Sequence, residues 1–96
     1  PNIATAILMT LTLLIEIQPT AFTKHATALV NSSASLLFDQ NSTKKRLAAI
    51  TFLAALLRNV RSCIPFERLA MLLLEVAELL KVELSRPIRN EAIKLM

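Results

Sequence analysis

The chain has 96 residues and a formal net charge of +4, so it holds one domain at most and carries a modest excess of basic side chains. It contains no glycine, which excludes Gly-rich phosphate-binding loops and disfavours β-hairpin turns. It contains a single cysteine, so neither an internal disulfide nor a zinc site built on several cysteines can form within the chain.

Apolar residues are in excess. They make up 54% of the chain, above the roughly 45–50% of ordinary soluble domains. A chain this short has too much surface to bury that many apolar side chains. Its first residue is Pro1 and not Met. We therefore expect residues 1–96 to form a single helical domain that is a fragment of a larger helical-repeat protein, or that packs against itself or a partner.

Prolines and short polar stretches divide the chain into five apolar segments with a helical period. Pro19, Pro65 and Pro87 each suit the first turn of a helix, where the missing N–H is harmless. The predicted helices span residues 2–17, 19–38, 43–60, 65–83 and 86–96.

The first predicted helix contains an apolar run of 13 residues, from Ile3 to Ile15, which Glu16 closes. This is short of the roughly 20 residues needed to span a bilayer. A packed core helix is the better interpretation. The alternative is a dimerisation or membrane-surface helix, with a seam formed by Ile7, Leu8, Leu11, Leu14 and Ile15.

Small polar residues predict several helix ends. Asn31-Ser32-Ser33 compete for backbone hydrogen bonds and are candidates to break the second helix. Ser42 or Asn41 is suited to cap the start of the third helix, and Ser85 the start of the last. Asn59 is suited to the left-handed conformation that ends the third helix.

The third and fourth helices are apolar over most of their circumference. Their predicted polar stripes consist only of Lys44, Ala48, Thr51, Ala55, Arg58 and Ser62 in the third and Glu67, Met71, Glu75 and Glu78 in the fourth. The apolar arc is about 200° wide, against somewhat over 100° for an ordinary surface helix. Such helices need neighbours on two sides, as stacked helical pairs provide. A closed four- or five-helix bundle is the alternative.

The stretch 42–96 resembles a HEAT or armadillo repeat. Three parts carry the similarity: Lys44 to Leu53 as a first helix, Pro65 to Leu80 as its antiparallel second helix, and Ser85-Arg86-Pro87-Ile88-Arg89 as the opening of the next unit. The spacing from Lys45-Arg46 to Arg86-Pro87 is about 41 residues, within the roughly 40–47 of these families. The resemblance implies an α-solenoid of antiparallel helical pairs, with partners lying along a concave surface built from the second helices.

No group of residues predicts catalysis, and we expect no enzyme, cofactor or metal site. His25 has no companion ligands near it in the sequence. Glu75 and Glu78 lie on the polar stripe beside Lys81, where a solvated helix face explains them. Cys63 is expected to be a small buried side chain at a helix end.

Five basic residues form the sharpest local hypothesis. Lys44, Lys45 and Arg46 stand in the first turn of the third helix, where positive charge is unfavourable by roughly 0.3–1 kcal/mol each. Arg86 and Arg89 open the last helix, so in a repeat arrangement they stack beside Lys45 and Arg46. We predict that the five form a basic ridge for an acidic peptide or a phosphate. Solvated helix ends in a basic chain are the alternative.

The function expected from these features is a non-enzymatic, intracellular protein–protein interaction scaffold. It binds another protein or peptide through an apolar helix face and the basic ridge. One alternative is a nucleic-acid- or chromatin-associated module using the same five basic residues, whose affinity would fall steeply with salt. The modest net charge and the lack of aromatic side chains among the basic ones count against it. A self-assembling helical bundle is the third possibility.

Overall fold

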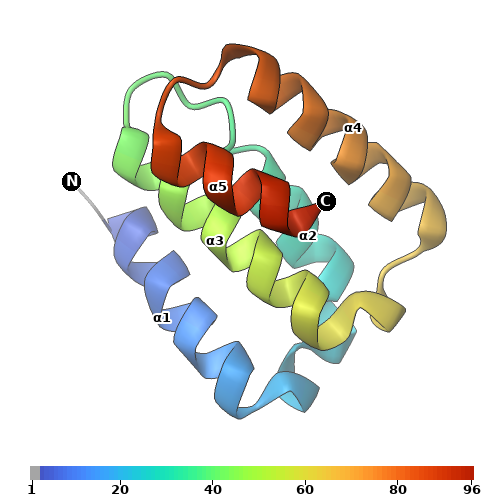
Figure 1. Cartoon of the computed structure of the whole chain (residues 1–96). Helices are drawn as coiled ribbons and strands as arrows, with labels where there is room; N and C mark the ends of the chain where they lie inside the picture. Colours follow the sequence, from blue (N-terminus) through green and yellow to red (C-terminus); the bar gives the residue numbers. More distant parts are fainter. Residues whose placement is uncertain (1–2) are drawn as a thin grey trace.

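A computed structural model describes residues 3–96, which form five α-helices and, within that range, no strand (Figure 1). The helices are α1 Ile3–Ile17, α2 Ala26–Ala34, α3 Thr43–Val60, α4 Phe66–Val82 and α5 Arg86–Leu95, with 3₁₀ segments η1 Pro19–His25 and η2 Arg61–Cys63. The all-α prediction is confirmed. The predicted domain also includes Pro1 and Asn2, and the predicted first helix begins at Asn2; both residues lie outside the described part of the chain.

Four predicted helices match α1, α3, α4 and α5 to within one residue at every described end. Local chemistry explains the agreement at α3, because Ser42 Oγ accepts a hydrogen bond from the N–H of Lys45 at 3.1 Å, as an N-cap should. The predicted Ser85 cap is wrong in its chemistry: Ser85 precedes α5, but its side chain makes no capping bond. Its N–H instead donates to Glu83 Oε2 at 3.2 Å.

The prediction of one continuous helix over 19–38 is wrong. The segment begins as the 3₁₀ helix η1, continues as α2, and leaves the helix after Ala34 in a series of turns. The helix thus ends directly after Asn31-Ser32-Ser33, where Ser35 Oγ donates to the carbonyl of Ser32 at 2.7 Å. Competition of small polar side chains for backbone groups accounts for the early end.

The left-handed conformation predicted for Asn59 is also wrong, because no residue in the described part of the chain has a positive φ. Asn59 is helical, and its Nδ2 donates to the carbonyl of Ala55 at 2.9 Å. The α-helix ends one residue later at Val60 and tightens into η2.

The helices form two layers (Figure 1). In one layer α3 lies between α1 and α5 and packs extensively on both. These three helices run in the same direction, with their amino-terminal ends at one edge of the layer. The other layer contains α2 and α4, which run in the opposite direction; α2 packs on α3, and α4 approaches α2 and α5.

The helix α3 is the centre of the core. All six residues from Phe52 to Leu57 are buried, as are the three residues 48–50. The assignment of Ala48 and Ala55 to a polar stripe is therefore wrong. α3 has neighbours on three sides, so its small side chains become contact points. α4 is different: only Leu72, Val76 and Leu79 are buried.

The seam predicted on the first helix is divided between two faces. Leu8 and Ile15 are buried in the core and Leu11 packs against it, whereas Ile7 and Leu14 are exposed. Because two members are buried and a third is partly buried, this set cannot form one contact surface.

No single helix among residues 3–96 is long and apolar enough to cross a membrane. By length and composition alone, α1 taken together with Pro19–Ala34 meets that criterion as a pair bent by 118°.

Candidate protein-binding face

The five basic residues predicted to bind a partner have two different fates in the structure. Lys45, Arg46 and Arg89 are partly buried and engaged within the molecule. Lys44 and Arg86 are exposed and form no ion pair within residues 3–96.

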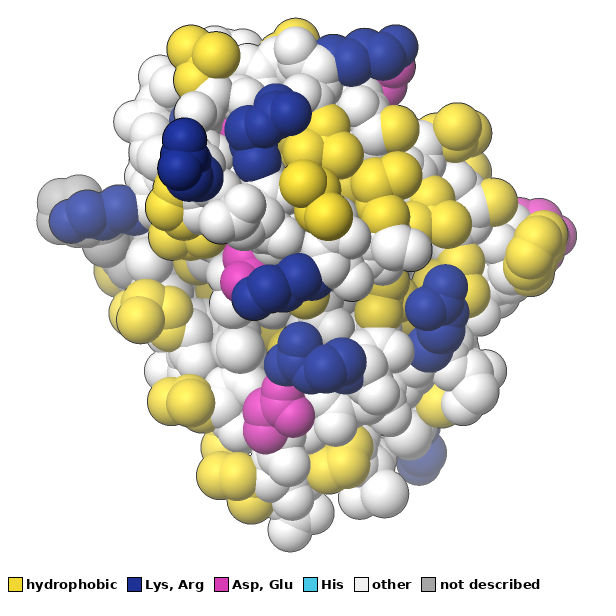
Figure 2. Space-filling view, in the orientation of Figure 1, with side chains coloured by type: hydrophobic (Ala, Val, Ile, Leu, Met, Phe, Trp, Pro, Cys, Tyr) yellow, Lys and Arg dark blue, Asp and Glu magenta, His cyan; other side chains and the backbone are white. Residues whose placement is uncertain are grey.

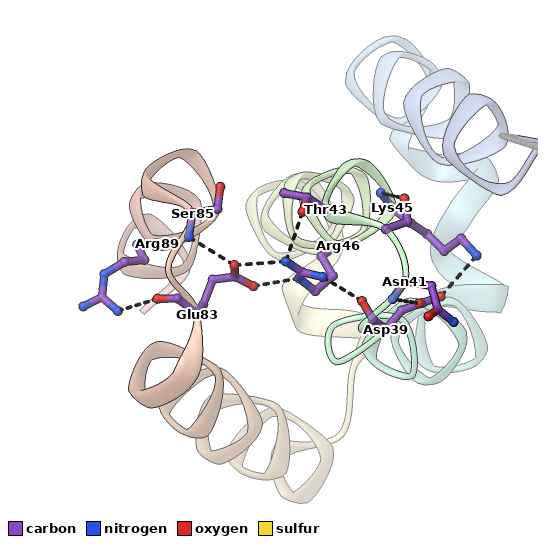
Figure 3. A network of polar contacts seen from close by, with 9 residues as sticks. Asp39, Asn41, Thr43, Lys45, Arg46, Glu83, Ser85 and Arg89 are labelled. Carbon is purple, nitrogen blue, oxygen red and sulfur yellow. Dashed lines mark hydrogen bonds and ion pairs between the residues drawn. The ribbon is translucent and has the colours of Figure 1, made fainter.

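Arg46 forms a two-pronged ion pair with Glu83 (Figure 3). Its Nε donates to Glu83 Oε1 at 2.8 Å, and its Nη2 donates to Glu83 Oε2 at 3.2 Å. Its Nη1 donates to the backbone carbonyl of Asp39 at 2.8 Å. Only 16% of the Arg46 side chain and 5% of the Glu83 side chain are exposed. The pair therefore ties the first turn of α3 to the α2–α3 connection and to the residue that follows α4.

The electrostatic state of Glu83 follows from these contacts. Burial alone raises the pKa of its carboxyl group, but the hydrogen bonds from Arg46 and from the N–H of Ser85, with the charge of Arg46, outweigh burial. The net pKa lies below the ordinary value of 4.5, so Glu83 is ionised at neutral pH.

Lys45 is paired on the other side of the same turn. Its Nζ lies 3.1 Å from Asp39 Oδ2, and Asp39 Oδ1 accepts the N–H of Asn41 at 2.9 Å. The Asn41 hydrogen bond and the Lys45 contact lower the pKa of Asp39 below its usual 3.8.

Arg89 caps the end of a neighbouring helix. Its Nη1 donates to the carbonyl of Leu80 at 2.5 Å. The same Nη1 donates to the carbonyl of Glu83 at 3.0 Å (Figure 3). Carbonyls in the last turn of a helix lack intrahelical partners, and a cation there also suits the helix dipole. Arg89 thus binds α4 to α5.

Three of the five residues of the predicted basic ridge are thus engaged within the molecule. Figure 2 shows the basic side chains of the viewed face as separate islands among hydrophobic and uncharged ones. The charges in the first turn of α3, which oppose the helix dipole, are explained by internal carboxylates for Lys45 and Arg46. Of the five predicted residues, Lys44 and Arg86 remain available to a partner.

An open groove of about 390 Å³ runs between α1 and α3. It is lined by Thr5, Met9, Thr12 and Leu13 of α1 and by Lys44, Leu47, Ala48 and Thr51 of α3. Lys44 is the only charged residue in this lining and stands at the amino-terminal end of α3.

The threonines in the groove do not make it polar. Thr12 Oγ1 donates to the carbonyl of Leu8 and Thr51 Oγ1 to the carbonyl of Leu47, each at 2.7 Å. Each of these two hydroxyl groups is satisfied by its own helix. The buried Thr5 Oγ1, in contrast, has no hydrogen-bond partner among the described residues, so one unsatisfied hydroxyl remains in an otherwise apolar lining. The groove is therefore suited to an apolar ligand surface.

A second depression lies beside the first, between α3 and α5. Leu47 and Thr51 line both, and Arg86 and Lys94 line the far side of the second. Lys94 is paired with Glu91 at 3.3 Å. Lys44 and Arg86 therefore flank Leu47 at the edge where α3 and α5 begin. We call the two depressions with these cations the α1–α3–α5 face.

Sequence reasoning missed the acidic partners and the groove. Glu83 lies 37 positions from Arg46, so local pattern could not pair them. The unfavourable cations in the first turn of α3 were a signal that some compensating group existed. Met9 and Leu13 lie outside the predicted seam, although both are apolar residues of the same helix.

The remaining candidates are Cys63 and His25. Cys63 is exposed, so its predicted burial is wrong. Its place in the short η2 turn leaves it beside the core and not within it. His25 is exposed at the end of η1. In residues 3–96, no three His, Cys, Asp or Glu side chains are grouped closely enough to hold a metal ion.

Comparison with known proteins adds no assignment: no family model, curated protein or solved structure matches the chain.

Proposed function

We propose that the chain is a non-enzymatic protein–protein interaction module whose α1–α3–α5 face binds an acidic amphipathic helix of a partner protein. One observation carries the proposal: an apolar groove lined by Lys44 adjoins a second depression lined by Arg86, and these two exposed cations form no ion pair within residues 3–96.

The geometry favours a helical partner. A groove between two parallel helices accepts the apolar face of a third helix. The residues of that third helix that contact the groove lie at positions i, i+3, i+4 and i+7. The edge that carries Lys44 and Arg86 also holds the amino-terminal ends of α3 and α5, where the helix dipoles favour negative charge. An acidic group at one end of the partner helix is therefore expected at that edge.

The HEAT- or armadillo-like architecture belongs to the same proposal. It is supported by the alternation of helix direction between two layers, with α1, α3 and α5 side by side in one of them. Apolar side chains at both ends of this layer, including Ile3 and Ile17 on α1 and Ile93 on α5, would suit neighbouring repeats. The closed bundle is the competing arrangement, supported by the enclosure of α3. An intracellular location is proposed with the scaffold role.

A nucleic-acid-binding role has less support. Three of the five basic residues that it requires are committed to internal hydrogen bonds and ion pairs. Reversal of Lys45 and Arg46 to Glu would break these internal contacts and disturb the fold. Lys44 and Arg86 are the informative positions.

The experiment uses a fluorescent helical peptide of about 18 residues, with Leu at helical spacing and three Glu at one end. We expect saturable binding measured by anisotropy. Lys44→Glu should weaken it about tenfold, because an attractive rim contact becomes repulsive. Met9→Glu should abolish it, because a charge would enter the apolar groove.

Controls separate the face from general charge effects. Lys24→Glu changes the net charge by the same amount from an exposed position on η1 and should leave the affinity unchanged. The same peptide with Lys in place of Glu should bind weakly. Equal affinity for both peptides, or an unaffected Met9→Glu variant with an unchanged circular dichroism spectrum, would contradict the proposal. Binding of dodecanoate or duplex DNA at this face in preference to the acidic peptide would also contradict it.

A further inference from the structure

The two ends of the groove between α1 and α3 differ in charge. At the end where both helices begin, Lys44 is exposed and forms no ion pair within residues 3–96. Beyond the other end, Glu16 of α1 is bound to Arg58 of α3, so the two charges there cancel. The groove therefore has one positive end and one neutral end.

The helix starts add to this difference. α1, α3 and α5 begin at the same edge (Figure 1), and none of these three helices, as described, has an acidic residue in its first turn. Acidic side chains in that turn ordinarily offset the positive end of the helix dipole. The carboxylates of Asp39 and Glu83 near this edge are each bound to a basic residue. Lys44 and Arg86 then make this edge the positive side of the α1–α3–α5 face.

The length of the groove limits what it can hold. Its lining runs from Thr5 to Leu13 on α1 and from Lys44 to Thr51 on α3. The α1 side therefore extends about 12 Å, at 1.5 Å per residue. Three apolar residues at positions i, i+4 and i+7 of a partner helix span about 10.5 Å and fit this length. The next turn of the partner, at either end of that stripe, lies outside the groove.

We infer that the partner helix runs antiparallel to α1 and α3 and carries its acidic residues in the turn that follows its last groove-contacting residue. This inference rests on the proposed function and names the direction and motif of its partner. The acidic turn leaves the groove beside Lys44, and Arg86 lies across Leu47 from it. The recognised segment thus has three apolar residues at i, i+4 and i+7, followed within one turn by Asp or Glu.

The helix dipoles select this direction. A helix carries about half a positive charge at its amino-terminal end and about half a negative charge at its carboxyl-terminal end. An antiparallel partner adds its negative end to its acidic residues at the positive edge. A parallel partner with the same acidic residues brings its positive end there and so weakens the attraction. The preference therefore depends on the direction of the partner and not on its composition.

Two peptides of identical composition test the inference. Each carries three Leu at i, i+4 and i+7 and three Glu, which lie in the turn after the last Leu in one peptide and before the first Leu in the other. Acetylated and amidated ends remove the terminal charges. We expect the peptide with carboxyl-terminal Glu to bind about fivefold more tightly in fluorescence anisotropy. Equal affinities, or tighter binding of the other peptide, would overturn the inference.

Helix formation by the free peptides opposes the expected result, which sharpens the test. Glu in the first turn stabilises an isolated helix, whereas Glu in the last turn destabilises it. Circular dichroism of the free peptides should therefore show more helix in the peptide that binds more weakly. Tighter binding of the less helical peptide comes from the edge of the protein and not from preformed structure.

The two exposed cations should account for most of the preference. In a Lys44→Gln, Arg86→Gln double variant we expect the difference between the peptides to fall to about twofold. A Lys24→Gln, Arg61→Gln variant removes the same charge from exposed positions outside the face and should keep the full difference. An equal loss of preference in both double variants would show that net charge is the cause and would overturn the inference.

Disulfide trapping tests the direction without relying on affinity. Thr5→Cys and Leu13→Cys, each in a Cys63→Ser background, mark the two ends of the groove on α1. In the peptide with carboxyl-terminal Glu, a Cys directly after the last Leu should pair with Thr5→Cys. A Cys directly before the first Leu should pair with Leu13→Cys. The reverse pairing would mean parallel helices and would overturn the inference.

The outcomes separate this inference from the proposed function. Failure of both peptides to bind would contradict the proposed function, and the inference with it. Equal binding of both peptides that Met9→Glu abolishes would leave the proposed function standing and overturn the direction alone.

Discussion

The two ends of α3 each carry an arginine bound to a glutamate, but in different surroundings. At the amino-terminal end, Arg46 and Glu83 are nearly enclosed and share contacts with Asp39, Thr43 and Ser85 (Figure 3). At the carboxyl-terminal end, Arg58 binds Glu16 with 61% and 43% of their side chains exposed. The first pair joins the start of α3 to two connections of the chain, α2–α3 and α4–α5. The second pair joins only α1 and α3.

The comparison shows that burial determines how much stability is lost when one partner of an ion pair is removed. An exposed pair loses little when one partner is removed, because water replaces it. A buried pair is costly to break, since the remaining charge is left without water or partner. The same residue types at the two ends of one helix should therefore respond very differently to substitution.

The largest effect is expected at Glu83. Glu83→Gln should lower the free energy of unfolding by about 3 kcal/mol, because Arg46 would keep its charge in a nearly enclosed site. Urea unfolding followed by circular dichroism measures this. An Arg46→Met, Glu83→Leu double variant should recover much of the loss. A double variant as unstable as Glu83→Gln would show that the charge is not the cause.

Acid should weaken the same end of α3. The pKa of Glu83 is lower in the folded chain than its ordinary 4.5, so its stabilising effect is complete above about that pH. The effect is lost as the pH falls through the folded pKa. Urea midpoints at pH 7, 5 and 3 should decrease toward acid, with a smaller decrease for Glu83→Gln. Identical pH profiles for the two proteins would rule out Glu83 as a contributor.

A smaller effect is expected from the cap of α3. Ser42→Ala should cost about 1 kcal/mol, because the N–H of Lys45 loses its acceptor. Ser62→Ala, at an exposed residue in the η2 segment, is the control and should leave the thermal midpoint unchanged. Equal shifts for both variants would point to a general effect of serine removal.

The smallest effect is expected at the opposite end. The hydrogen bonds from Arg58 and Asn59 lower the pKa of Glu16, but both partners of the ion pair are well exposed. Glu16→Gln should therefore leave the urea midpoint unchanged within error at physiological salt. A loss of unfolding free energy comparable to that of Glu83→Gln would contradict the conclusion that burial distinguishes the two ion pairs.

Local signals predicted much of the fold. The 3.6-residue period located the helices, and Pro87 and Ser42 marked two of their starts. The second helix was the exception, because its tightening into η1 depends on how that segment packs on α3. Its early end after Ala34 follows the small polar stretch Asn31-Ser32-Ser33, which the sequence had marked as a candidate break. For the candidate site, Lys44 and Arg86 were named in advance, whereas the groove residues Met9 and Leu13 were not.

The sequence by itself determined the all-α class, most helix boundaries and the excess of apolar helix surface, since each depends on residues a few positions apart. The tertiary structure alone decided which cations are committed internally, which alanines of α3 are buried, and which stripe of α1 faces the core. Those outcomes depend on contacts between distant segments. Arg46 and Glu83 acquire their roles only when α3 and the α4–α5 connection meet, because burial there makes an unpaired charge costly.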